Sequence, residues 1–481
     1  MAFSRGGSKA AVLALVLVSA VVAGCGGAAA SATAGASPTA PASATAFPSP
    51  SASAAASAAG CPALADSPVG RQLQWAVDEV NGKAATMTTA DINEHFAPAA
   101  LAQVSPDQLI TALRQVETAG PFTLSGCEPT GADGMRAILT GPAARLSATI
   151  QVEPDPPSRI VGLLFRPVVD ASPAASWADI DVAMSKIAPE ASVTVAELQN
   201  DTCVPIHQYN ATAPHAIGSA FKLYVLGELA RQVGTGGLSW DQQLAVRDDW
   251  KSLPSGTMQN EPAGTTHPLS YYAQQMISIS DNTAADHLIH LLGRDKVEAN
   301  LPAMGLANPA ADEPFLLTRD MFVLKATKNA ALAKSYLAAD AAGRRTILDK
   351  TVASTPLAVA DLADWSAPRY VDTLEWFAGT NDLCAAMAKL HQDAAQPGLA
   401  PVLDILSVNP GVALDNSVWP YVGYKGGSEP GVLNLTWLVR RADGRWFVLS
   451  MTLDDPVHAT DNTTAAVAVA TDAFRLLSQV K

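Results

Sequence analysis

Basic residues are scarce in this chain, and their scarcity excludes one large class of function. Of the 481 residues only 31 are lysine or arginine, whereas 45 are aspartate or glutamate, and the formal net charge is −14. Because no dense run of lysine and arginine occurs either, we do not expect a nucleic-acid partner. Cysteine is also rare: there are five, and no two of them have the C-x-x-C spacing of a zinc motif.

The apolar run at the N-terminus, from Ala10 to Ala23, is too short to span a bilayer. It follows Arg5 and Lys9 and leads into Gly24-Cys25, and small residues before a cysteine resemble the bacterial lipobox. We therefore interpret residues 1–25 as a signal peptide with lipidation at Cys25. The predicted location is the outer face of the cell membrane, to which the exported protein would be anchored. The alternative is an ordinary secretory signal in which Cys25 is incidental.

Residues 26–60 contain only Gly, Ala, Ser, Thr, Pro and the single Phe47, and they carry no charge. Such a composition cannot bury enough apolar surface to fold. We predict a disordered tether between the lipid anchor and the rest of the chain.

Two folded domains are expected after the tether. Residues 61–170 have two segments with helical spacing, followed by four strand-like segments separated by Gly, Pro and Asp turns. This order predicts a small α+β domain, which resembles the nuclear transport factor 2 and ketosteroid isomerase fold. It contains no evident catalytic constellation, so we expect a binding or spacer role. Residues 171–481 have strands at both ends and helices between them, which predicts a sheet flanked by helices.

Four cysteines follow the tether, and export to an oxidising compartment favours disulfides among them. Four cysteines allow three pairings. The domain boundaries favour Cys61–Cys127 and Cys203–Cys384, which places one bridge in each domain. The alternative is that some of these residues are free buried thiols.

A serine and a lysine stand three residues apart at the start of an apolar helical segment. Positions i and i+3 share one face of a helix, so the amine of Lys222 can reach the hydroxyl of Ser219. Beside apolar neighbours a buried lysine loses part of its preference for charge and can act as a base. The pair alone is weak evidence, because Ser478-x-x-Lys481 has the same spacing. The alternative is a capping serine and a lysine that reaches out to solvent.

Two further motifs strengthen the catalytic interpretation. Ser280-Asp281-Asn282 lies in a predicted turn 61 residues after Ser219, and Lys425-Gly426-Gly427 lies on a predicted strand before the final hairpin. S-x-x-K, S-D-N and K-T-G together are the signature of class A β-lactamases and penicillin-binding proteins. Each motif has a simpler explanation, since Ser280-Asp281-Asn282 could cap a helix and Lys425 could be a solvated strand end. The occurrence of all three in order favours an active site.

The second domain therefore resembles the superfamily of serine β-lactamases and penicillin-binding proteins. The whole layout resembles a group of exported actinobacterial proteins, including a mycobacterial lipoprotein and the β-lactamase-like protein of clavulanate gene clusters, in which an isomerase-like domain precedes a lactamase-like one. The resemblance implies that Ser219 forms an acyl-enzyme and that Lys222 accepts its proton. It further implies the following roles: Ser280 bridges to the leaving atom, Lys425 supplies positive potential, Asn282 and Gly427 bind substrate, and the backbone N–H groups of Ser219 and Ser428 form an oxyanion hole.

The sequence departs from this pattern at two positions. Gly426 stands where the family has a hydroxyl residue that helps to bind the substrate carboxylate, and Ser428 could partly replace it. The E-x-x-L-N motif of class A enzymes has only a partial match, in which Glu313 is a candidate base for deacylation and Leu317 stands in place of the asparagine. The alternative is that Glu313 belongs to a surface loop, in which case Lys222 serves deacylation or turnover is slow.

The prediction is an exported, lipid-anchored serine hydrolase that acts on a β-lactam, ester or amide carbonyl and needs no cofactor. We also expect no metal site, because His287 and His290 have no third ligand at useful spacing. The expected partners are a small-molecule or cell-wall peptide substrate and the membrane, and the protein is expected to be a monomer. The rival functions are a D-Ala-D-Ala carboxypeptidase or penicillin-binding protein, and a binding lipoprotein without catalysis.

Overall fold

The computed structural model describes residues 61, 64–101, 104–129, 133–142, 145–168, 173–412, 414–459 and 463–481. The predicted signal peptide, the lipidation site Cys25 and the tether lie outside the described residues. The chain divides into two units, Met1–Ala171 and Ser172–Lys481. Within the described ranges, the helices are all too short or too polar to cross a membrane.

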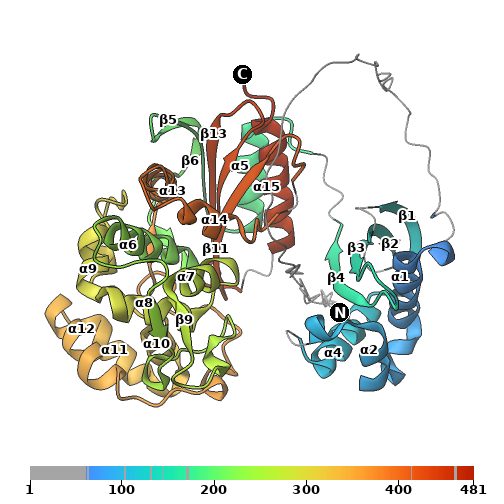
Figure 1. The fold of residues 1–481 in the computed structure, drawn as a ribbon, viewed down its shortest axis with the longest axis horizontal. Helices are drawn as coiled ribbons and strands as arrows, with labels where there is room; N and C mark the ends of the chain where they lie inside the picture. Colours follow the sequence, from blue (N-terminus) through green and yellow to red (C-terminus); the bar gives the residue numbers. More distant parts are fainter. Residues whose placement is uncertain are drawn as a thin grey trace, which may run out of the picture. The chain divides into compact units, whose positions relative to one another are not determined.

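The first unit places helices against a four-stranded antiparallel sheet of order β1-β2-β3-β4 (Figure 1). Two of its helices begin with a capping box, which satisfies exposed N–H groups of the first turn, at Thr88–Asp91 and Ser105–Gln108. The core forms between the helices and alternate residues of the strands. The elements are α1 (Pro68–Asp78), α2 (Thr89–His95), α3 (Pro98–Leu101), α4 (Pro106–Glu117), β1 (Thr123–Pro129), β2 (Gly134–Thr140), β3 (Arg145–Val152) and β4 (Ile160–Pro167).

The second unit is built on a five-stranded antiparallel sheet of order β11-β12-β13-β5-β6. Its strands are β5 (Glu190–Gln199), β6 (Thr202–Tyr209), β11 (Tyr421–Glu429), β12 (Val432–Arg440) and β13 (Trp446–Asp454). The C-terminal meander joins the N-terminal hairpin where β13 pairs with β5, in a register that runs from Asp454 opposite Glu190 to Phe447 opposite Glu197. The two ends of this unit therefore complete one sheet, as the strand pattern predicts.

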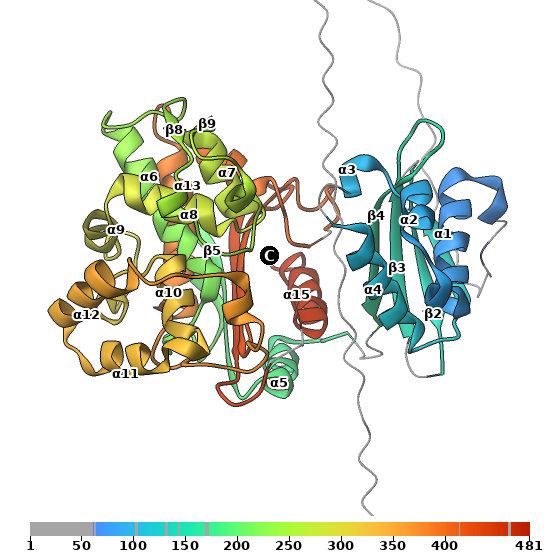
Figure 2. The ribbon, with the colours of Figure 1, turned by 90° about the horizontal axis from the view of Figure 1, so that it is seen from below.

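Helices cover both faces of this sheet. α5 (Trp177–Ile187) and α15 (Thr463–Leu477) pack on one face, and the helical part of the unit lies against the other (Figure 2). β12 is buried at every position but its last, as expected for a central strand with both faces covered.

The helical part is formed by the segment between β6 and β11. Its first long helix, α6, is buried on nearly all sides, which suits its mostly apolar sequence. The helices are α6 (Lys222–Gly234), α7 (Leu269–Ser278), α8 (Asn282–Leu292), α9 (Arg294–Asn300), α10 (Thr318–Lys325), α11 (Ala330–Ala338), α12 (Ala341–Ile347), α13 (Thr380–Ala394) and α14 (Pro401–Ser407). Two small sheets pair β7 (His215–Ala216) with β10 (Phe377–Ala378) and β8 (Gln243–Ala245) with β9 (Thr266–Pro268).

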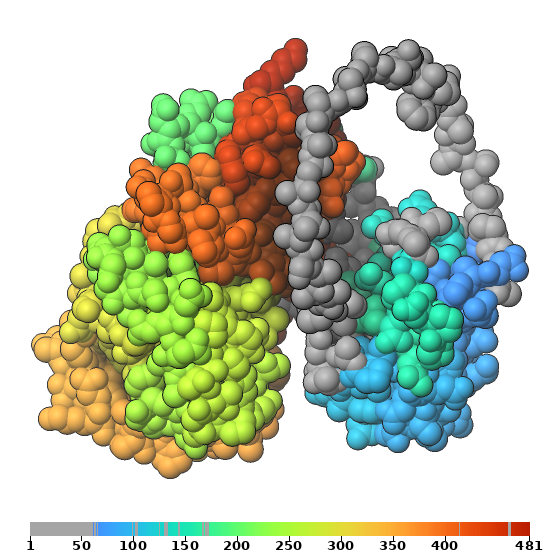
Figure 3. All heavy atoms as spheres, viewed as in Figure 1, coloured from blue at the N-terminus to red at the C-terminus, as the bar shows by residue number. Residues whose placement is uncertain are grey.

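The helices between Ser280-Asp281-Asn282 and Lys425-Gly426-Gly427 lie in two different parts of the unit. α11 and α12 form an outer face of the helical part (Figure 3). α13 packs against the sheet, because its apolar residues belong to the main core. It is also bonded to β6 through the disulfide Cys203–Cys384, and the first unit contains the other expected pair, Cys61–Cys127.

Candidate active site

Ser219 lies in a short 3-10 helix, Gly218–Phe221, that leads directly into α6. Nζ of Lys222 lies 3.1 Å from Oγ of Ser219, so the two side chains meet as the spacing predicts. Phe221 stacks on Trp376 with ring centroids 3.9 Å apart, and both residues belong to the main core. The serine and its base therefore stand at the start of a helix whose packing fixes both of them.

Ser280 occupies the turn between α7 and α8. Its φ angle is +58°, a left-handed conformation that is strained for a residue with a Cβ. In this conformation its carbonyl oxygen lies 2.6 Å from Nζ of Lys222 and its Oγ lies 3.1 Å from the same nitrogen. Asp281 holds the turn by accepting hydrogen bonds from the N–H groups of Ala284 and Thr257. The motif thus caps α8 through Asp281 and supplies the site through Ser280.

Lys425 reaches the same serine from the edge strand β11. Its Nζ lies 3.0 Å from Oγ of Ser280 and 2.5 Å from the carbonyl oxygen of Gly426. The three predicted motifs therefore meet at Ser280. Ser280 lies in a turn, Lys222 lies at the start of a helix, and Lys425 lies on a strand.

Gly427 permits β11 to pass directly beside the nucleophile. A Cβ at this residue would stand 2.0 Å from the carbonyl oxygen of Ile217 and 2.5 Å from the amide nitrogen of Ser219. Gly218 has a φ angle of +46°, and a Cβ there would stand 3.0 Å from the amide nitrogen of Ser428. The backbone amides of Ser219 and Ser428 thus flank this contact. The close approach depends on the absence of a side chain at Gly427, whose predicted contact with substrate stays a prediction.

A phenol fills the space beside Gly426 where the family has a hydroxyl side chain. A Cβ at residue 426 would stand 2.1 Å from Oη of Tyr424, which is closer than two unbonded atoms can approach. Tyr424 in turn packs against Trp437 in a tilted arrangement, with ring centroids 5.0 Å apart. Residue 426 therefore lacks the hydroxyl of the family, and Tyr424, two residues earlier, occupies the space beside it. The motif alone does not predict this tyrosine.

Burial sets the protonation of the two lysines. Loss of solvent lowers the pKa of Lys222 to about 7, against a smaller opposing effect of Asp281 and Asp286. Burial also lowers the pKa of Lys425 well below that of an exposed lysine, and repulsion by Lys222 adds to the change. Burial therefore disfavours the positive charge expected on Lys425, and a charge on Lys222 disfavours it further.

Asn282 lies at the start of α8 and is almost fully buried. Its Oδ1 accepts a hydrogen bond from Lys222 at 2.6 Å, and its Nδ2 donates to the carbonyl oxygen of Leu253 at 3.1 Å. Both ends of the amide therefore have protein partners. Asn282 orients the lysine, and the predicted substrate contact would use the remaining Nδ2 proton.

Family models match both units of the chain. A model of the β-lactamase enzyme family matches residues 176–477, well over half of the chain, and a model of the ORF 12 gene product N-terminal region matches residues 64–156. The chain belongs to the β-lactamase enzyme family. No curated protein matches it significantly.

Several solved structures are similar to the β-lactamase-like unit. A β-lactamase from Sphaerobacter thermophilus is 17% identical and covers 64% of this chain and 99% of its own, with a TM-score of 0.45. The penicillin-binding protein PBP-A is 15% identical over 64% of this chain and 99% of its own, with a TM-score of 0.43. A β-lactamase from Chitinophaga pinensis is 14% identical over 62% and 98%, with a TM-score of 0.45. The assignment to the β-lactamase family rests on the family model.

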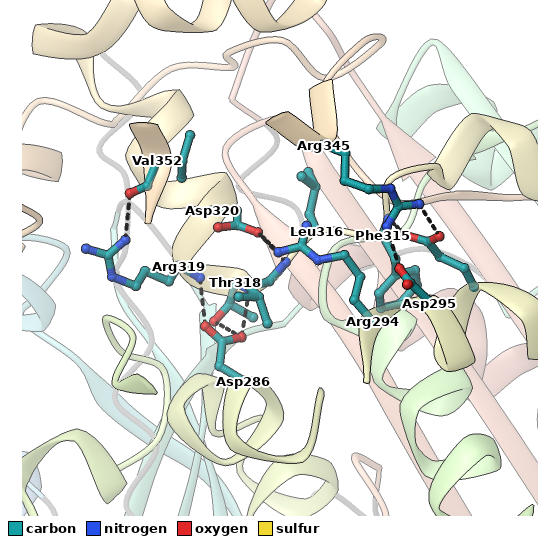
Figure 4. Close-up of polar contacts among 12 residues, drawn as sticks. Asp286, Arg294, Asp295, Phe315, Leu316, Thr318, Arg319, Asp320, Arg345 and Val352 are labelled. Atoms are coloured by element: carbon teal, nitrogen blue, oxygen red, sulfur yellow. Dashed lines mark hydrogen bonds and ion pairs between the residues drawn. The ribbon is translucent and has the colours of Figure 1, made fainter. Parts of the chain in front are cut away.

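The loop that carries Glu313 in this β-lactamase family member is anchored through buried carboxylates (Figure 4). Asp286 on α8 accepts hydrogen bonds from the N–H of Thr318 at 2.7 Å and from the N–H of Arg319 at 2.9 Å. Arg294 bonds to Asp320 at 2.8 Å. Burial raises the pKa of Asp286 to about 7. These contacts fix the end of the loop that follows Glu313.

Glu313 itself is exposed. Among the residues that the structure describes, no hydrogen bond or ion pair joins it to Ser219 or Lys222. The hydrogen bonds and ion pairs of the described residues therefore do not link Glu313 to the three motifs. Its exposure favours the surface-loop alternative.

The two histidines on α8 have partners within the protein. Nε2 of His287 accepts a hydrogen bond from the N–H of Arg247 at 2.9 Å, and its Nδ1 lies 2.7 Å from the carbonyl oxygen of Thr283. His290 stays exposed and stacks on Trp250 with ring centroids 4.7 Å apart. Both residues pack the helix against its neighbours.

Ser255 lies beside the site but belongs to none of the three sequence motifs. Oγ of Ser255 donates to the carbonyl oxygen of Ser280 at 2.7 Å, and the carbonyl oxygen of Ser255 accepts from the N–H of Asn282 at 3.0 Å. It holds the strained turn from the opposite side. A serine in a loop 25 residues earlier has no spacing that links it to Ser280.

Proposed function

We propose that this protein is an exported serine hydrolase that forms an acyl-enzyme on Ser219 with an ester, amide or β-lactam carbonyl. The observation that carries the proposal is the contact of 3.1 Å between Oγ of Ser219 and the buried Nζ of Lys222. A lysine with a pKa of about 7 is half neutral near pH 7, and only a neutral amine can accept the proton of the serine.

Acylation follows from the positions of these groups. Lys222 accepts the hydroxyl proton while Oγ of Ser219 attacks the carbonyl carbon. The N–H groups of Ser219 and Ser428 stabilise the negative oxygen that forms. Ser280, in contact with both lysines, then relays a proton to the leaving nitrogen or oxygen. The leaving group departs, and the acyl group stays on Ser219.

Deacylation is the weaker half of the proposed cycle. Glu313 is exposed, so we assign the activation of water to Lys222. One amine then serves both steps, and hydrolysis of the acyl-enzyme is slow. The exposure of Glu313 also supports the second candidate function, a penicillin-binding protein or D-Ala-D-Ala carboxypeptidase whose acyl-enzyme is long-lived.

The proposed location is the outer face of the cell membrane, with a lipid on Cys25. The two disulfides support export, because disulfides persist in oxidising compartments. In this proposal the residues before Cys61 serve only as anchor and tether.

Intact mass spectrometry tests the proposal. The protein without residues 1–25 would be mixed with a penicillin, a cephalosporin or an activated ester, beside a Ser219→Ala control. An adduct that appears and decays, and is absent from the control, supports a hydrolase. A persistent adduct supports a penicillin-binding protein. No adduct with any probe would exclude the acyl-enzyme mechanism and favour a binding lipoprotein.

A further inference from the structure

Three ligand-type side chains converge at one end of the main sheet, outside the serine site. Glu190 begins β5 and Asp454 ends β13, and the two residues stand directly opposite each other in the strand register. His215 lies on β7, four residues before Ser219. Its Nδ1 is 3.8 Å from Oε2 of Glu190 and 4.0 Å from Oδ2 of Asp454. The ligand atoms of all three lie within 4.8 Å of one another.

The polar side-chain atoms of His215 and Asp454 lack hydrogen-bond partners although the two residues are buried. Asp454 is 1% exposed and His215 is 8% exposed. Within the described part of the chain, both carboxylate oxygens of Asp454 and both ring nitrogens of His215 have no hydrogen bond of normal geometry. The amides of Leu433 and Ala216 face Asp454 and lower its pKa, but they complete no such bond. Four unpaired polar atoms in one buried place are costly, because each has lost its water.

The charges around the cluster are negative. Acidic groups directly opposite each other on paired strands repel, as Glu190 and Asp454 do here. Glu375 also repels the carboxylate of Asp454, and Asp372 and Asp455 repel the carboxylate of Glu190. The buried Lys325 bonds to Glu375 and Glu429 rather than to the cluster.

We propose that Glu190, His215 and Asp454 bind a divalent transition metal ion, for which zinc is the best fit. Zinc takes both imidazole nitrogen and carboxylate oxygen as ligands, and water would complete the coordination. Metal–ligand bonds of about 2.0–2.2 Å bring ligand atoms to roughly 3.4 Å from one another, so small side-chain movements close the present distances. The side chain of Glu190 is 44% exposed and gives the ion a route from solvent.

The proposed ion has a structural role and does not depend on the hydrolase activity. It would join the ends of β5 and β13 to β7. β7 leads into the 3-10 helix that holds Ser219, so the ion would fix the segment that carries the nucleophile. No step of the proposed acyl transfer passes through it.

The test uses the chain without residues 1–25, stripped with a chelator and titrated with zinc chloride by calorimetry, with metal content measured after dialysis. We expect one tightly bound zinc ion per chain and a rise in Tm of about 5 °C at a zinc concentration about 100-fold above Kd. His215→Gln and Glu190→Gln are expected to weaken binding by more than about tenfold. Glu190→Gln changes a half-exposed side chain, so it tests the site even if changes at the buried residues prevent folding.

The matched control is His207→Gln, which removes another partly buried histidine of the same unit, one bonded to Asp181 at 2.7 Å. It is expected to bind zinc as the unchanged protein does. The proposal is wrong if the unchanged protein binds no stoichiometric zinc, or if His207→Gln weakens binding as much as His215→Gln. It is also wrong if Glu190→Gln leaves the affinity unchanged, because the zinc then lies elsewhere.

Discussion

The amines of Lys222 and Lys425 contact a single oxygen, since Oγ of Ser280 lies 3.1 Å from Nζ of the first and 3.0 Å from Nζ of the second. Two full positive charges so close together in a buried site would repel strongly. The pKa values of both amines are lowered, and their protonation is linked. Ser280 therefore connects two amines, and each disfavours a positive charge on the other.

The first prediction concerns the pH dependence of acylation. Lys222 acts as a base only when it is neutral, and its pKa of about 7 lies below the ordinary value of 10.5. The rate of acylation by an activated ester should therefore rise with pH, with a midpoint near 7, and level off above it. Stopped-flow kinetics between pH 5.5 and 9 measure this profile. A flat profile would show that Lys222 is not the base.

The second prediction concerns the close approach at Gly427. In Gly427→Ala the new methyl group would overlap the backbone of Ile217 and Ser219, so β11 must move away from the nucleophile. We expect acylation to slow by at least about 100-fold, the effect of losing an oxyanion donor, with a loss of stability of about 1–3 kcal/mol.

The control for this change is Gly237→Ala. A Cβ at Gly237 would meet only the carbonyl oxygen of Gln232, at an ordinary 3.5 Å. This variant should acylate at the unchanged rate. Normal acylation by Gly427→Ala would mean that the amide of Ser428 takes no part in the reaction.

The third prediction concerns the pairing of Gly426 with Tyr424. Gly426→Thr places a side chain where Oη of Tyr424 now lies, so the variant should be destabilised by about 1–3 kcal/mol. Tyr424→Ala removes the obstruction. The double variant should therefore lose less stability than the sum of the single variants, by at least about 0.5 kcal/mol. Urea unfolding of the four proteins measures this difference, and simple additivity would show that the two positions do not compete for space.

The fourth prediction concerns Glu313. Its exposed side chain leads us to expect that Glu313→Gln changes the lifetime of the acyl-enzyme by no more than about twofold. The decay of the adduct in time-resolved mass spectra measures this lifetime, with Glu94→Gln, an exposed change in the other unit, as the control. A lifetime prolonged more than about tenfold would restore Glu313 as the base for deacylation.

The fold and the three motifs could be predicted because they depend on local patterns. The spacing of Ser219 and Lys222 places them on one helical face, and the Asp443-Gly444 turn between apolar strands indicates a hairpin, which the structure has as β12 and β13. The family assignment to the β-lactamase group is confirmed by the matching model. The likeness of the first domain to the nuclear transport factor 2 fold remains a prediction.

Other features depend on contacts between distant segments and leave no local signal. The segment that became α13 has the same helical spacing whether it covers a site or packs in the core, and only the fold shows that it lies against the sheet. The phenol of Tyr424 occupies the space beside Gly426, which lies two residues further along the strand. Glu190, His215 and Asp454 come from three separated strands, so a search for ligand spacing, which led to the prediction of no metal, could not find them.

The pairing of β13 with β5 has a consequence for the order in which the molecule can assemble. Ser219 and Ser280 lie in the first part of the second unit, but Lys425 arrives on β11, which joins the sheet only through β12 and β13. The ribosome must therefore synthesise the chain beyond residue 454 before β11, which carries Lys425, can join the sheet. A partly synthesised chain would hold its nucleophile without the backbone of β11 beside it. Reactivity at Ser219 thus reports that the chain has been made at least as far as the end of β13.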